Sequence, residues 1–133
     1  MTDYTMSVTV DRPYDETVAA VRESLADQGF GVLTEIDVAA TMKKKLDVDV
    51  AAQVILGACR PELAHRALVA VPSIATMLPC NVVVRSVDDA VTVVEALDPM
   101  AMLHFADDEA LHEVATDARG RLRAALDSLE GAR

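Results

Sequence analysis

The chain has 133 residues, a length that suits one domain, so we expect a single domain over residues 1–133. Hydrophobic residues make up 52% of it and charged residues 26%, a balance that permits a buried core and excludes a disordered chain. The 22 acidic residues outnumber the 12 lysines and arginines, and the net charge is -10. This excess argues against binding to nucleic acid or to an anionic membrane surface, because both need a basic surface.

The N-terminal residues indicate a location. They include an acidic residue and lack the basic segment followed by an apolar one that a secretory leader needs. The apolar stretch 67–80 is too short to span a bilayer and contains Pro72 and Pro79. We therefore expect a cytoplasmic protein in which both cysteines are reduced, not joined in a permanent disulfide.

The first part of the chain predicts a strand, a helix and a second strand. Residues 5–10 alternate between apolar and polar, the pattern of a half-buried strand. A helix begins near Pro13 and ends at Gly29, which is expected to form a left-handed cap. The second strand covers residues 30–37, and simple alternation places Glu35 on the face opposite the apolar residues of that strand.

The middle of the chain predicts short helices around a third strand. Asp37 is placed to cap a short helix that ends at residue 46, and residues 46–52 are expected to form a loop. Residues 53–59 are apolar enough for a central strand. A helix then begins at Pro61, and one further helical turn follows at residues 74–78.

The last part predicts a hairpin and a long helix. Strands beginning at Cys80 and at Ala90 are joined by a turn at 88–89, and a helix over residues 107–129 carries an apolar stripe. Without the short helices, the expected order of elements is one strand, one helix, four strands and one helix (β-α-β4-α). We expect an α+β fold with an antiparallel or mixed sheet, helices on one face, and short helical insertions around the third strand.

Two cysteines and a histidine form the most informative group. Cys59 ends one strand and Cys80 begins the next, so antiparallel pairing would bring both to the same edge of the sheet. Cys59 also precedes a helix N-terminus, and this position beside Arg60 predicts a lowered pKa for its thiol. His65 lies about one and a half turns into the same helix, and we expect it to reach the cleft beside the thiols.

This group admits several interpretations. Cys59, Cys80 and His65 could hold a soft metal, with Met77, His104 or water as a fourth ligand. One thiolate could instead carry a sulfur atom or attack an electrophile. Both cysteines could also be buried structural residues, because cysteine often fills small apolar spaces.

A second polar group contains Glu35, Asp37, Thr41 and Lys45. It could bind an anionic ligand through Lys45, or Glu35 and Lys45 could act as an acid–base pair. The alternative is a helix cap beside a solvated surface. No cofactor can be assigned from either group.

Five segments carry a resemblance to a known family. They are residues 29–37 (GFGVLTEID), 41–46 (TMKKKL), 55–59 (ILGAC), 63–68 (LAHRAL) and 78–84 (LPCNVVV). Together they resemble the domain of unknown function 302 family of small bacterial and archaeal proteins. The resemblance implies a compact α+β domain of the TATA-binding-protein-like type, generally a homodimer. Because the role of that family is not established, it implies no catalytic residues.

The motif positions of that family still indicate where a site would lie. Arg60 departs from the pattern, which usually has Asn or another polar residue there. The matching positions are Glu35, Asp37, Lys45, Gly57, Cys59, Pro61, His65, Pro79, Cys80 and Asn81.

Three classes of function stay open at this point. The first is a homodimeric module that binds a small ligand, and apolar strands around residues 82–94 also favour a dimer. The second is a sulfur-carrier or soft-metal protein that uses Cys59, Cys80 and His65. The third is a small enzyme that uses Glu35 and Lys45.

Overall fold

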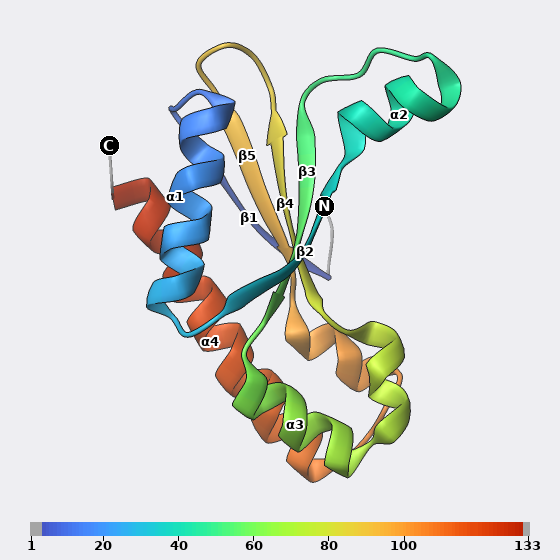
Figure 1. Ribbon diagram of the computed structural model, residues 1–133. Helices are drawn as coiled ribbons and strands as arrows, with labels where there is room; N and C mark the ends of the chain where they lie inside the picture. The colour runs from blue at the N-terminus through green and yellow to red at the C-terminus, as the bar shows by residue number, and fades with distance from the viewer. Residues whose placement is uncertain (1–3, 132–133) are drawn as a thin grey trace.

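A computed structural model describes residues 4–131 and shows five antiparallel strands in the order β1-β5-β4-β3-β2 (Figure 1). The strands are β1 (Thr5–Val10), β2 (Gly31–Asp37), β3 (Gln53–Cys59), β4 (Cys80–Ser86) and β5 (Thr92–Leu97). The helices are α1 (Tyr14–Asp27), α2 (Val38–Leu46), α3 (Pro61–Ala70) and α4 (Glu109–Gly131), with 3-10 helices η1 (Pro72–Met77) and η2 (Pro99–His104). The predicted α+β class and the β4–β5 hairpin are confirmed.

The main core lies between one face of the sheet and the helices α1 and α4 (Figure 1). Leu25 of α1 and Leu122 of α4 are buried against the strand residues Leu56, Val84 and Val94, all of which are almost inaccessible to solvent. Burial of these apolar side chains is the main force that holds the helices on the sheet.

Helix α1 ends as its sequence predicts. Gly29 has a φ of +83°, a conformation that favours glycine. The N–H of Phe30 donates to the carbonyl of Leu25 (3.0 Å), and the N–H of Gly29 donates to that of Ala26 (2.9 Å). This pair of bonds is a Schellman motif, and it turns the chain directly into β2.

A second core cluster lies beyond the lower ends of the strands (Figure 1). The 23 residues of α4 span about 35 Å, so this helix continues past the sheet. Its first half packs against Leu63 of α3, Ile74 of η1 and Met102 of η2. The short helices on either side of the hairpin therefore form a lobe at one end of the sheet.

Strand β2 contains a bulge that overturns one prediction. Its register with β3 shifts between Val32 and Thr34, so Leu33 is an extra residue. Beyond the bulge Glu35 lies opposite Leu56, which is buried beneath the helices. Opposed residues of an antiparallel pair point to the same face. The prediction that Glu35 lies on the opposite face from the apolar residues is therefore wrong.

Helix α2 and the loop after it, residues 38–52, project from the upper end of the sheet (Figure 1) and are called the arm below. No residue of α2 is buried. Leu46, Val48 and Val50 of the arm are exposed, as is Ile36 just before it. Among the helices in the described part of the chain, none combines the length and hydropathy needed to cross a bilayer.

Candidate functional site

The two cysteines lie at the same edge of the sheet. Ala58 pairs directly with Cys80, so Cys59 is displaced from Cys80 by one residue on the neighbouring strand. Standard strand spacing puts their Cα atoms roughly 6 Å apart. Both are free thiols and both are half-buried.

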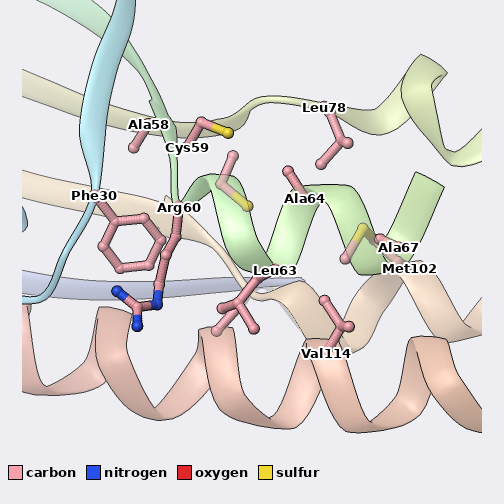
Figure 2. Close-up of a pocket in the computed structure, with 12 residues that line it drawn as sticks. Phe30, Ala58, Cys59, Arg60, Leu63, Ala64, Ala67, Leu78, Met102 and Val114 are labelled. Carbon is pink, nitrogen blue, oxygen red and sulfur yellow. The ribbon is translucent and has the colours of Figure 1, made fainter. Parts of the chain in front are cut away.

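Cys59 and Cys80 line one small cavity between the ends of β3 and β4, α3 and α4 (Figure 2). Leu63, Val114 and Met102 also line it, and its surface is almost entirely apolar. Its volume is about 30 Å³. Sites for organic ligands usually measure about 300–1,000 Å³, so this cavity suits a single atom or ion better than a small molecule.

The expected lowering of the Cys59 pKa is not found. Burial raises the pKa of Cys59 above its usual value, and Glu62 in the first turn of α3 raises it further. Burial also raises the pKa of Cys80 to about 11, with a smaller contribution from Cys59. Desolvation disfavours the thiolate, and here it outweighs the helix N-terminus and Arg60.

Arg60 is turned away from solvent and packs beside Phe30 (Figure 2). Its guanidinium covers Gly29 so closely that a Cβ on that glycine would lie 2.0 Å from Nη1. Nη1 also lies 3.6 Å from a carboxylate oxygen of Glu62. The Nε atom is buried and has no hydrogen-bond partner within the described structure.

His65 does not join the cysteines. It lies on the exposed side of α3, while the cavity is lined by Leu63, Ala64 and Ala67 of that helix. Within residues 4–131 no group of three histidine, cysteine, aspartate or glutamate residues could hold a metal ion. The proposed ligand set of Cys59, Cys80 and His65 is therefore not assembled.

Met102 is the cavity residue that the sequence reasoning missed. Met77 and His104, considered as a fourth ligand, do not line the cavity, whereas Met102 on η2 does. A local signal was present, because Asp98 accepts a hydrogen bond from the N–H of Met100 (2.9 Å) and Pro99 opens the helix. Asp–Pro is a helix start as well as a strand break.

The polar group around Glu35 is brought together only in part, because Glu35 and Asp37 line one cavity of about 240 Å³ that neither Thr41 nor Lys45 lines. Glu35 forms an ion pair with Arg22 of α1. Asp37 caps α2 by accepting a backbone N–H bond (2.9 Å), and the Thr41 hydroxyl donates to the Asp37 carbonyl (2.8 Å). No recorded contact in the described part of the chain joins Glu35 to the exposed Lys45. The helix-cap interpretation accounts for Asp37 and Thr41, and an acid–base pair of Glu35 and Lys45 is not formed.

A larger hollow lies where the lobe meets the uncovered end of the sheet. Two adjoining cavities of about 300 and 430 Å³ share Leu97, Ala101 and Phe105, and together they form what we call the η1–η2 groove. The other lining residues are Tyr4, Thr76, Met77, Leu78, Pro79, Asn81, Met102 and His104. Pro79 and Asn81, both among the predicted motif positions, therefore line a cavity of ligand size.

Comparison with known proteins identifies a family. The family model described as "Domain of unknown function DUF302" matches residues 6–129. The crystal structure of an uncharacterised conserved DUF302 protein from Bacillus stearothermophilus is similar, with 32% identity and a TM-score of 0.85. The match covers 95% of this chain and 98% of the other. No curated protein matches the chain.

Proposed function

Because the chain belongs to the DUF302 family, whose function is unknown, we propose a function from its own geometry: it is a small-ligand-binding module whose site is the η1–η2 groove. The observation that carries this proposal is the size of the groove. Its two parts, of about 300 and 430 Å³, each fall in the range of ordinary ligand sites.

The lining of the groove indicates the chemistry of the ligand. Phe105 is 77% exposed and Tyr4 is 56% exposed, so two aromatic side chains border the groove without a protein partner to cover them. Asn81, Thr76 and His104 supply a few hydrogen-bonding groups. This combination fits a largely apolar or aromatic small molecule that carries one or two polar groups.

Filling the groove tests the proposal. Ala101 lines both of its parts, so Ala101→Trp should obstruct them. Anilinonaphthalene sulfonate, an aromatic dye, serves as the probe in a fluorescence titration. We expect one dye molecule per chain and an affinity at least about 10-fold lower in Ala101→Trp, equivalent to about 1.4 kcal/mol.

The matched control is Ala90→Trp, at an exposed position in the β4–β5 hairpin. It adds the same side chain far from the groove and should leave dye binding unchanged. Equal binding by both variants would reject the groove as the site. Native mass spectrometry of the purified protein would then show whether any small molecule is retained elsewhere.

The second part of the proposal is that the protein forms a homodimer, and the exposed surface of the arm supports this assembly. Its apolar residues Leu46, Val48 and Val50 are exposed and pack against no core. All three lysines of the chain, at residues 43–45, lie in this arm, and although Lys43 forms ion pairs with Asp47 and Asp49, the arm keeps a small positive charge whereas the whole chain carries a net charge of -10. A second copy therefore offers the arm an acidic surface of complementary charge.

Light scattering tests the dimer. The wild-type protein should have twice its chain mass of 14.2 kDa at micromolar concentration. Leu46→Asp should produce the monomer mass, while Val87→Asp, at a similarly exposed site in the hairpin, should not. A monomeric wild-type protein, or a dimer that survives Leu46→Asp, would contradict the role of the arm.

The other two function classes have weaker support. Both thiols have raised pKa values, and the thiolate is the form that carries sulfur or attacks an electrophile. Glu35 is paired with Arg22, not with Lys45. A cytoplasmic location, which would keep both thiols reduced, is part of the proposal.

A further inference from the structure

Three sulfur-containing side chains from three different elements line the cavity at the sheet edge. Cys59 comes from the end of β3, Cys80 from the start of β4 and Met102 from η2. The two cysteines are the only ones in the sequence. The strand register brings their backbones to the same edge of the sheet, because Cys80 lies directly opposite the residue before Cys59, and the side chains of both line the cavity. Met102, itself 4% exposed, is held there by the second core cluster.

We propose that Cys59, Cys80 and Met102 form a binding site for one soft monovalent cation, of which Cu(I) is the biological example. Thiolate and thioether sulfur are the ligands that Cu(I) prefers. This cavity adjoins the η1–η2 groove and shares Met102 with it, but the inference does not depend on the function proposed above.

The size and lining of the cavity favour a small ion with few ligands. Its volume of about 30 Å³ exceeds the roughly 10–15 Å³ that a single water molecule needs and is far below that of an organic-ligand site. The nearly apolar wall offers no oxygen-rich shell for a hard cation such as Mg²⁺ or Ca²⁺. A structural Zn²⁺ site needs four ligands. His65 and His104 do not line the cavity, so the three sulfur atoms have no nitrogen partner.

A monovalent ion bound by two thiolates leaves only a small net charge in and around the cavity. Coordination replaces the proton of each thiol by a bond to the metal, two protons leave to solvent, and the oxidation state of copper does not change. Two thiolates and one Cu(I) leave a charge of −1. Arg60 lines the same cavity, and its buried Nε has no hydrogen-bond partner in the described structure. Its positive charge, which is shared with Glu62 at 3.6 Å, offsets part of the negative charge of the complex.

A path for the metal exists because both cysteines are half-buried and not sealed in the core. Leu78 and Met102 line both the cavity and the η1–η2 groove, so the groove is the nearest large opening beside the sulfur atoms. Reactive and metal-binding cysteines are typically partly exposed, as these two are.

The test uses the reduced full-length chain and Cu(I) in competition with bathocuproine disulfonate under anaerobic conditions. We expect one Cu(I) per chain. Cys59→Ser and Cys80→Ser should each lower the affinity by more than about 100-fold, beyond the loss caused by an outer-shell partner. Met102→Leu keeps the side-chain volume and should lower it by about 10-fold.

The matched control is Met6→Leu. Met6 is also buried, at 5% exposure, but it lies in the main core and does not line the cavity. Its replacement should leave Cu(I) affinity unchanged. If Met6→Leu and Met102→Leu changed the Cu(I) affinity equally, Met102 would not be a ligand.

X-ray absorption spectroscopy of the copper-loaded wild-type protein identifies the ligand atoms without any variant. It therefore tests the site even if a cysteine variant fails to fold. We expect coordination by sulfur alone. Nitrogen or oxygen ligands, more than one copper per chain, or unchanged affinity in both cysteine variants would overturn the proposal.

Discussion

Gly57, in the middle of β3, is a position where a single methyl group should destabilise the fold. A Cβ there would lie 2.1 Å from the Thr34 hydroxyl oxygen and 2.7 Å from Cγ of Pro79. Thr34 is exposed and can rotate its hydroxyl away, but the Pro79 ring is fixed at the entrance to β4. Gly57→Ala must therefore displace backbone.

Overpacking of this kind costs about 1–3 kcal/mol. Replacing a strand glycine by alanine would otherwise stabilise the protein by about 0.5–1 kcal/mol, so the expected net effect is a loss. At roughly 4 °C for each kcal/mol, the melting temperature should fall by several degrees. Because Pro79 also lines the η1–η2 groove, dye binding should weaken in the same variant.

Thermal and urea unfolding of Gly57→Ala and Gly120→Ala provide the measurement and its control. Gly120 lies on the exposed side of α4, and a Cβ there would meet nothing within 4 Å. Gly120→Ala should therefore stabilise the protein by about 0.5–1 kcal/mol. If Gly57→Ala were stabilising to the same degree, the close approach of Pro79 would be refuted.

Three other predictions follow from burial and charge. Leu122 is 1% exposed in the main core, so Leu122→Ala should cost about 2–5 kcal/mol in a denaturant titration, and a loss below about 1 kcal/mol would contradict its place there. Iodoacetamide at neutral pH should label Cys59 before Cys80, because burial raises the Cys80 pKa to about 11; equal labelling rates on a peptide map would contradict this. Hydrogen bonds from Arg85 and Thr5 lower the pKa of Glu95, so its contribution to stability is present above its usual pKa of 4.5 and is lost as the pH falls through the lowered value. Glu95→Gln should flatten this acid dependence in unfolding titrations, and an unchanged profile would exclude Glu95 as its source.

Part of the candidate site was predictable because it depends on short-range rules. Two consecutive strands that pair antiparallel must bring Cys59 and Cys80 to one edge, and the structure has them there. Met102 could not be placed in the same way. It reaches the cavity only because η2 packs on α4. The sequence separations between residues 59, 80 and 102 do not indicate that contact.

The direction of the Cys59 pKa shift also could not be predicted from the local sequence. Local sequence predicted a lowered pKa for Cys59 from the helix that follows it and from Arg60. In the structure burial and Glu62 instead raise this pKa, while the Arg60 guanidinium is held over Gly29, a residue distant in sequence. The direction of a pKa shift depends on every group around the thiol, most of which are contributed by other elements.

The sequence alone determined the elements of this protein and where most of them end, because caps, prolines and apolar periodicity act within a few residues. Gly29 ends α1 and Asp37 caps α2, each as its residue type predicts. Only the tertiary structure decided which face each residue occupies after the β2 bulge, so that the exposed Glu35 lies opposite Leu56 and pairs with Arg22 of α1. It also decided which side chains share a cavity. An extra strand residue or a helix docked on a distant partner changes the surroundings of a side chain without changing the local pattern that predicts its element.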